Sequence, residues 1–219
     1  MATAASFSHD SRQPAEPVQI GPYLARVDQP NGLLLKLLYR LLRRRFGKVP
    51  GWLTVFSARM PLAFTNWIGK VSKLDEKLEL SSDTAIPLRE RVAGTNMCTW
   101  CMDATKWFAT NRAPHNLPKF DALHEYQTSP LFSDQERAAL AFATELTEHK
   151  HVSPETFAAL SRHYSEREIC EIVWLVSSEH LYNINNLGLG IGSDGLCEIS
   201  RANAAASRAS SPLTRETRP

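Results

Sequence analysis

The 219-residue chain has almost no net charge: 25 lysines and arginines stand against 23 aspartates and glutamates, a balance of +2. A protein whose main partner is nucleic acid usually carries a strongly basic surface. We therefore expect no nucleic-acid partner. A hydrophobic share of 43% with 22% charged residues is ordinary for a globular protein long enough to bury a core.

Long apolar runs are also missing. The longest, near Leu33 to Leu42, is interrupted by Lys36 and Arg40 and is too short to cross a bilayer. The first ten residues have neither the cationic start nor the apolar core of a secretory signal. Four cysteines are too few for a secreted disulfide framework. We expect a cytoplasmic protein with no membrane partner.

Strand signals are nearly absent, and apolar residues recur with the helical period along most of the chain. Capping boxes begin at Ser133 and Ser165, and Ser153 precedes a proline at a first helical position. The sequence predicts an all-α, single-domain bundle over residues 18–199, with disordered ends at residues 1–17 and 200–219. The predicted helices cover residues 31–46, 52–60, 61–78, 83–96, 97–112, 133–149, 153–164 and 165–186.

The first predicted helix is rich in both leucine and arginine. Its expected apolar face consists of Leu34, Leu37, Leu38, Leu41 and Leu42. The basic residues toward another face suit either an anionic membrane surface or the solvent side of a partly buried helix. Since the chain offers no second membrane anchor, the solvent-side interpretation is favoured.

The most informative motif is Cys98-Thr99-Trp100-Cys101. Cysteines three residues apart share one face of a helix and can close a disulfide. Asn96 is the expected N-cap, which places Cys98 in a first turn where unpaired N–H groups and the helix dipole favour a thiolate. One thiol would attack a peroxide or disulfide, and the other would resolve the intermediate.

Two other interpretations of the pair remain open. A structural zinc site needs a second pair of ligands, and Cys170 and Cys197 stand alone, without a CxxC or HxxxH partner. The pair could also be inert buried thiols. In a reducing compartment a close CxxC pair favours redox chemistry. Cys170 is expected to be inert packing in an apolar helix, and Cys197 is a less favoured third redox partner.

The region Pro87 to Asp103 (PLRERVAGTNMCTWCMD) resembles the signature of the alkylhydroperoxidase D / carboxymuconolactone decarboxylase family. The runs Glu179 to Asn183 and Leu189 to Cys197 resemble the ending of a longer branch, so the likeness spans residues 33–197. The resemblance implies an all-α fold and homo-oligomers. It also implies that members with CxxC reduce peroxides or protein-bound disulfides, whereas the ring decarboxylases generally lack the cysteine pair.

The chain departs from the family pattern at two positions. Thr105 stands where the family has a histidine four residues after the second cysteine. Ile86 stands where the family has a glutamate twelve residues before the first cysteine. Of the family's proton relay, only Cys98 and Cys101 are therefore carried over to this chain.

Three residues are candidates for the missing proton chemistry. Glu90, one helical turn after Ile86, is a displaced base or else a solvated glutamate between two arginines. Glu179 extends the apolar face of its helix, where burial would raise its pKa. His180 beside it is a candidate replacement for the histidine. Alternatively, Glu179 and His180 belong to a polar helix end that faces solvent or another subunit.

Three residues in or near the motif have less specific roles. The negative charge of Asp103 would disfavour a thiolate, so we expect it to pair with an arginine or cap a turn. Trp100 and Trp107 either wall the dithiol or belong to the core.

The sequence thus predicts a thiol-dependent peroxidase or disulfide reductase that cycles between dithiol and disulfide and takes electrons from an external thiol donor. The helix-terminus argument favours Cys98 as the attacking thiol, and the resemblance favours Cys101. The alternatives are a decarboxylase-like lyase acting on a cyclic acid without the cysteines, and a non-catalytic helical interaction protein. No Gly-rich phosphate loop follows a strand, and no cofactor or metal is expected.

Overall fold

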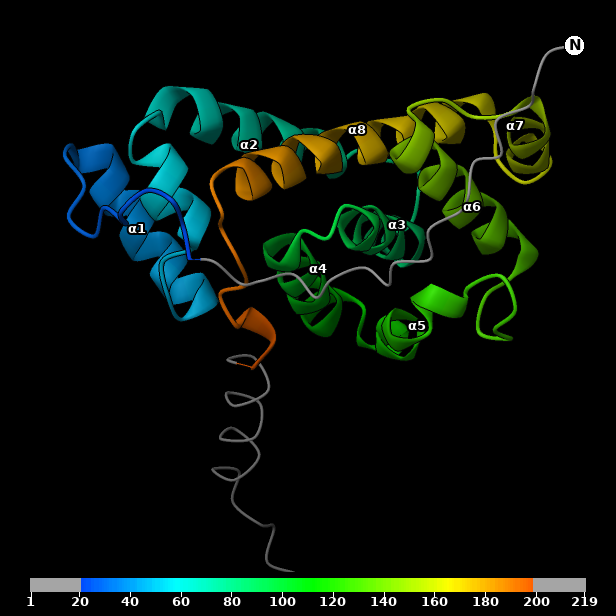
Figure 1. Cartoon of the computed structure of the whole chain (residues 1–219), viewed down its shortest axis with the longest axis horizontal. Helices are drawn as coiled ribbons and strands as arrows, with labels where there is room; N and C mark the ends of the chain where they lie inside the picture. The colour runs from blue at the N-terminus through cyan, green and yellow to red at the C-terminus, as the bar shows by residue number, and fades with distance from the viewer. Residues whose placement is uncertain (1–20, 199–219) are drawn as a thin grey trace, which may run out of the picture.

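The computed structural model describes residues 21–198, so the ends predicted to be disordered, residues 1–17 and 200–219, lie outside the described residues. Within residues 21–198 every regular element is a helix, and the all-α prediction is confirmed (Figure 1). The α-helices are α1 Leu33–Phe46, α2 Pro61–Asp75, α3 Ser82–Thr95, α4 Thr99–Arg112, α5 Leu117–Asp121, α6 Asp134–His149, α7 Pro154–Ser161 and α8 Glu166–Gly188.

Two segments differ from the predicted helices. Residues 52–60, predicted as a helix, form a π-helical turn at Leu53–Ser57. The short helix α5, between 3₁₀ turns at Pro114–Asn116 and Leu123–Glu125, was not predicted. Five residues are too few to show a helical period, which explains this omission.

The predicted capping boxes are both present. Ser133 accepts a hydrogen bond from the backbone N–H of Glu136, whose carboxylate accepts one from the N–H of Ser133 in return. Ser165 and Glu168 make the same reciprocal pair at the start of α8. Because each box satisfies two N–H groups that a helix leaves unpaired, α6 and α8 begin where the sequence predicts.

Helix α3 lies at the centre and packs against α4, α6 and α8 (Figure 1). A continuous apolar core joins these helices to the segment around α5; its fully buried members include Leu88, Val92, Leu160, Ile172 and Leu175. The α3–α4 junction, which carries the cysteine pair, therefore joins two packed helices and faces α8.

Helix α1 turns inward only part of the predicted face: Leu38 and Leu42 are partly buried against the core, as predicted. Leu35, Tyr39 and Phe46 are buried, whereas Leu34, Leu37 and Leu41 are 62%, 60% and 60% exposed. Leucines surround this helix, so its sequence alone does not single out one stripe. Tyr39 fixes which face of α1 turns inward, because its hydroxyl donates a hydrogen bond to the carbonyl of Val27 at 2.7 Å.

Candidate active site

The turn that carries the cysteines is a Schellman motif at the end of α3. The N–H of Cys98 donates to the carbonyl of Ala93 at 2.9 Å, and that of Met97 donates to Gly94 at 3.0 Å. Met97 has φ 55°, a left-handed conformation that costs a non-glycine residue about 1 kcal/mol. Asn96 is thus the C-cap of α3, and Cys98 itself is the N-cap of α4. The prediction that Asn96 caps α4 was wrong.

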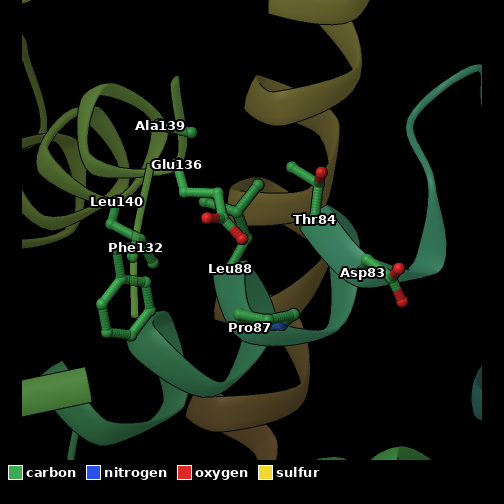
Figure 2. Close-up of a pocket in the computed structure, with 8 residues that line it drawn as sticks. All are labelled: Asp83, Thr84, Pro87, Leu88, Phe132, Glu136, Ala139 and Leu140. Atoms are coloured by element: carbon green, nitrogen blue, oxygen red, sulfur yellow. The ribbon is translucent and has the colours of Figure 1, made fainter. Parts of the chain in front are cut away.

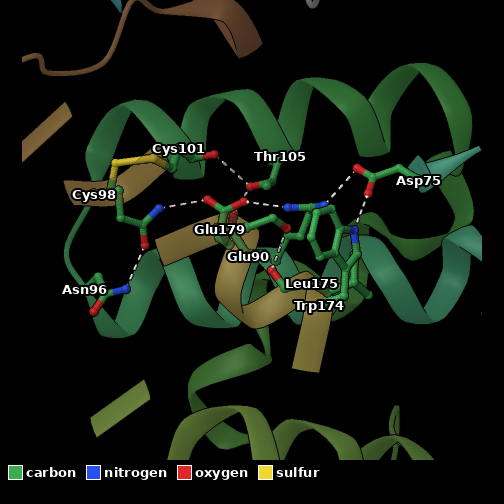
Figure 3. Close-up of polar contacts among 12 residues, drawn as sticks. Asp75, Glu90, Asn96, Cys98, Cys101, Thr105, Trp174, Leu175 and Glu179 are labelled. Atoms are coloured by element: carbon green, nitrogen blue, oxygen red, sulfur yellow. Dashed lines mark hydrogen bonds and ion pairs between the residues drawn. A yellow bond between two sulfur atoms is a disulfide. The ribbon is translucent and has the colours of Figure 1, made fainter. Parts of the chain in front are cut away.

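Cys98 and Cys101 are joined by a disulfide in which Cys101 occupies the first turn of α4 (Figure 3). Both residues are buried, with exposures of 0% and 2%. The apolar groups packed around the pair are Ala93, Trp100, Met102 and Tyr182. The pair therefore lies at the positive end of a helix dipole and away from bulk water, where that dipole acts most strongly on a thiolate.

Glu90 lies on α3 and is buried, so the interpretation of this residue as a solvated glutamate was wrong. The hydroxyl of Thr105, on α4, donates a hydrogen bond to the Glu90 carboxylate and also lies 3.0 Å from the carbonyl oxygen of Cys101 (Figure 3). Burial raises the pKa of Glu90 to about 7, although the hydrogen bond from Thr105 and the charge of Lys106 lower it. This carboxyl group is therefore close to half-ionised at neutral pH.

Glu179 is buried on α8, as its place on the apolar face predicts. It accepts a hydrogen bond from Asn183 at 2.8 Å and pairs with Arg89 at 3.2 Å. Arg89 also pairs with Asp75 at 2.8 Å, and Asp75 accepts a hydrogen bond from the indole of Trp174 (Figure 3). Burial raises the pKa of Glu179 even though Arg89 opposes the shift.

His180 contacts Asn96, with its Nδ1 atom 3.3 Å from the Asn96 amide nitrogen. The same amide donates to Asn183 at 2.7 Å. Burial lowers the pKa of His180, which favours the neutral ring. His180 therefore reaches the α3–α4 turn through Asn96.

Asn186 is a member of this site that the sequence analysis missed. Its side-chain nitrogen lies 3.4 Å from Sγ of Cys101 and 3.9 Å from Sγ of Cys98. Asn186 is one helical turn beyond Asn183 on the buried face of α8. That spacing is the signal that could have found it, because an asparagine on an apolar helix face needs buried hydrogen-bond partners.

The segment after α8 folds back onto the start of α4. Asp103 accepts hydrogen bonds from the N–H groups of Leu196 and Cys197 at 2.8 and 3.0 Å, so it caps a turn, one of its two predicted roles. The buried Asp194 accepts hydrogen bonds from the Trp100 indole at 2.7 Å and from the Gly51 N–H at 2.6 Å. These contacts fix the segment that holds the dithiol.

The remaining predicted residues lie apart from the dithiol cluster. Trp107 packs against Phe46 with its ring tilted by 59° and ring centroids 4.6 Å apart, and it is partly buried against the core. Cys170 is exposed on α8, so the prediction that it is buried packing was wrong. Cys197 is partly buried, and its thiol contacts the carbonyl of Asp103 at 3.4 Å.

A surface pocket between α3 and α6 does not involve the cysteines (Figure 2). Its lining residues are Asp83, Thr84, Pro87, Leu88, Phe132, Glu136, Ala139 and Leu140. The carboxylate of Glu136 accepts a hydrogen bond from the N–H of Ser133 and pairs with Lys119. Among residues 21–198 no group of His, Cys, Asp and Glu side chains could hold a metal ion, and no helix is long and apolar enough to cross a membrane.

Solved structures match most of the chain. The debrominase Bmp8 is 25% identical, with a TM-score of 0.65 over 82% of this chain and 94% of its own. An alkylhydroperoxidase AhpD core protein from Ralstonia eutropha, described as peroxidase-related, is 19% identical, with a TM-score of 0.58 over 74% of this chain and 86% of its own. The chain has the alkylhydroperoxidase D-like fold. The fold that the resemblance of the CxxC region implied is thereby confirmed.

Sequence comparisons are less extensive. No family model matches the chain. The uncharacterized protein YnjA of Escherichia coli (strain K12) is 31% identical over 114 residues, which are 50% of this chain and 60% of that relative. A cysteine-to-alanine variant of Bmp8 in complex with 2,3,4-tribromopyrrole is 24% identical, with a TM-score of 0.66 over 84% of this chain and 95% of its own. The alkylhydroperoxidase D-like fold therefore occurs in a debrominase as well as in peroxidase-related proteins.

Proposed function

We propose that this chain is a thiol-dependent oxidoreductase in which Cys98 and Cys101 cycle between dithiol and disulfide, with a peroxide as the favoured oxidant. The observation that carries the proposal is the buried disulfide at the start of α4. Because both cysteines are buried, a small peroxide needs less rearrangement to reach a sulfur than a disulfide on another protein does.

The peroxidase cycle balances with these two thiols. A thiolate attacks ROOH, the O–O bond breaks, and with one proton the products are a sulfenic acid and ROH. The second thiol then attacks the sulfenic sulfur, which forms the disulfide and releases water. An external dithiol restores the reduced pair by thiol–disulfide exchange and becomes oxidised itself.

Glu90 and Thr105 are the proposed proton-handling pair. With a pKa of about 7, Glu90 can both accept and return a proton near neutral pH. The Thr105 hydroxyl links the Glu90 carboxylate to the backbone carbonyl of Cys101 on α4. Glu179 and His180 are proposed as positioning residues, because they contact the α3–α4 turn through Asn183 and Asn96.

Reductive dehalogenation is the second candidate, and the 25% identity to a debrominase favours it. In that reaction a dithiol and an aryl bromide give the dehalogenated ring, bromide ion, a proton and the disulfide. The two sulfurs supply the two electrons, so the same pair of cysteines serves both reactions. The aromatic side chains of Trp100 and Tyr182 beside the disulfide suit a flat ring as well as a peroxide.

The deciding experiment offers hydrogen peroxide, cumene hydroperoxide and 2,3,4-tribromopyrrole separately to the full chain, with dithiothreitol as donor. We expect turnover of a peroxide that is lost in Cys98→Ser and in Cys101→Ser. The matched control is Cys170→Ser, which removes an exposed thiol on α8 and should retain wild-type rates.

The other outcomes assign the chain differently. If the chain consumes tribromopyrrole and turns over no peroxide, it is a dehalogenase. A cyclic acid decarboxylated by the Cys98→Ser, Cys101→Ser double variant would support the lyase alternative. Full reduction of the disulfide with no turnover of any oxidant would contradict the enzyme assignment.

A further inference from the structure

Asn186 is held rigidly beside the disulfide. It is 2% exposed, and its backbone carbonyl accepts a hydrogen bond from the N–H of Ile191 at 2.8 Å, where the chain leaves α8. Its side-chain nitrogen is within hydrogen-bond distance of Cys101 and 3.9 Å from Cys98. A disulfide sulfur has no proton and can only accept, so the amide must present its NH₂ group to the sulfurs.

The other half of the amide is unsatisfied in this oxidised state. The Oδ1 atom of Asn186 is buried and has no hydrogen-bond partner within residues 21–198. A buried acceptor left without a donor is unfavourable, because it has lost its hydrogen bonds to water and gained none in return. Within the described part of the chain, a donor for this Asn186 oxygen is therefore missing in the disulfide form.

Reduction supplies that donor. Two electrons and one proton convert the disulfide into one thiolate and one thiol, and the thiol carries an S–H group. A thiolate also accepts a hydrogen bond much more strongly than a neutral sulfur does, because the bond is charge-assisted. Both halves of the amide are therefore better satisfied when the pair is reduced.

We propose that the Asn186 amide stabilises the reduced Cys98/Cys101 pair, donating from Nδ2 to the thiolate and accepting the S–H of the second cysteine at Oδ1. This inference rests on the proposed dithiol cycle and adds a residue on α8 to it. Asn186 makes the disulfide a stronger oxidant and keeps a thiolate available at neutral pH.

Other ionisable groups also surround the pair and must be held constant in the test. They are Glu90 on α3, Asp103 on α4, and Glu179, His180 and Tyr182 on α8. Burial raises the pKa of Tyr182, which therefore stays neutral. Since Asn186 does not titrate, replacing it by leucine removes a hydrogen bond to the sulfurs and changes no charge, whereas replacing it by aspartate also adds a carboxyl group.

The experiment compares wild type with Asn186→Leu and Asn186→Asp, which have nearly the shape of asparagine. Asn185→Leu is the matched control, because Asn185 donates to the carbonyl of Leu181 at 2.8 Å instead of to a sulfur. Two quantities are measured on the full chain: iodoacetamide alkylation of the cysteine pair against pH, and the equilibrium constant of the disulfide with reduced and oxidised glutathione.

For Asn186→Leu we expect alkylation at neutral pH to slow on the order of tenfold, because a lost hydrogen bond to a charged group raises the thiol pKa. The glutathione equilibrium should shift toward the protein disulfide by a similar factor. Asn186→Asp should slow alkylation further, since its carboxylate repels a thiolate. Asn185→Leu should match wild type in both measurements.

Unchanged alkylation and equilibrium in the Asn186 variants, beside a wild type that cycles, would overturn this inference alone. A wild type that never forms the disulfide with peroxide or glutathione disulfide would overturn the proposed function as well. If Asn186→Leu lacks a helical circular dichroism spectrum, the smaller neutral variant Asn186→Ala, which also lacks the amide, provides the test and should show the same two shifts.

Discussion

Thr105 donates a hydrogen bond to Glu90, and this contact joins the two helices that flank the cysteine pair. Thr105 occupies the position of the family's histidine, and Glu90 lies one turn beyond the position of the family's glutamate. Thr105 is therefore in contact with a carboxyl group that lies close in sequence to the position left without one. A hydroxyl group stands where the family pattern has an imidazole, and its carboxyl partner comes from one turn further along α3.

The first prediction concerns the pH dependence of turnover. If Glu90 accepts a proton during the reaction, the rate with peroxide should rise as this group ionises, through about pH 7. Glu90→Gln should remove that rise and lower the rate at neutral pH on the order of a hundredfold. Rates measured across this pH range test both expectations. The control Glu155→Gln changes an exposed carboxylate on α7 and should keep the wild-type profile.

The second prediction concerns the pH dependence of the unfolding free energy, which tests whether Glu90 is buried. The folded-state pKa of about 7 lies above the ordinary glutamate value of 4.5, so between these values the folded chain holds a proton that the unfolded chain has released. The stability that Glu90 contributes is complete below about pH 4.5 and is lost as the pH rises through about 7. Each pKa unit corresponds to about 1.4 kcal/mol, which gives a total on the order of 3 kcal/mol.

Glu90→Gln cannot lose a proton, so its unfolding free energy should gain about 2 to 3 kcal/mol relative to wild type between about pH 5 and pH 8. Urea denaturation at the two pH values measures this difference. If the difference in unfolding free energy between Glu90→Gln and wild type is the same at both pH values, Glu90 is solvated and already ionised at about pH 5.

The third prediction concerns Glu171, which ties α8 to the loop before α3. Burial alone would raise its pKa, but the N–H groups of Leu80 and Glu79 and the side chain of Arg167 outweigh burial and lower it. Glu171→Gln should lower the unfolding free energy by about 2 kcal/mol or more, because an amide satisfies these donors less well. Denaturant unfolding at neutral pH, with the exposed Glu166→Gln as control, measures the difference. Equal stability of the two variants would refute this role.

The sequence predicted the fold well because the fold depends on local signals. The capping residues Ser133 and Ser165 and the helical periods are readable from neighbours in the chain, and the structure retains them. The site was less predictable because its contacts join distant segments. The Schellman turn was not predicted because Met97, and not a glycine, occupies its positive-φ position. The contact of Asn186 with Cys101 was not predicted because the two residues are 85 positions apart in the chain.

Glu90 shows why local composition misled the sequence analysis. Two flanking arginines suggested a solvated segment, but both have partners of their own. Arg89 pairs with Asp75 and Glu179, and Arg91 donates to Thr144 and lies over the ring of Tyr126. Their long side chains leave α3 in other directions, so the carboxylate between them can be buried against Thr105.

The last prediction concerns self-association, which the family resemblance implies. The exposed leucines of α1, including Leu34, Leu37 and Leu41, recur every three or four residues and so form an apolar stripe on one face of the helix. Fully burying a leucine is worth about 1.5 to 3 kcal/mol, so a contact that covers this stripe would stabilise an oligomer substantially. We expect sedimentation at micromolar concentration to give a species heavier than the 24.5 kDa chain.

The variant Leu37→Glu, Leu41→Glu should sediment as the 24.5 kDa chain, because covering the stripe would then bury two unpaired carboxylates. Lys36→Glu places a glutamate on the same helix outside the stripe and should leave the oligomer intact. A far-UV circular dichroism spectrum like that of wild type must accompany the monomer, since both leucines are exposed and the fold does not need them. An oligomer that survives the double substitution would mean that the subunits meet elsewhere, and a wild type that sediments only as a monomer would refute self-association itself.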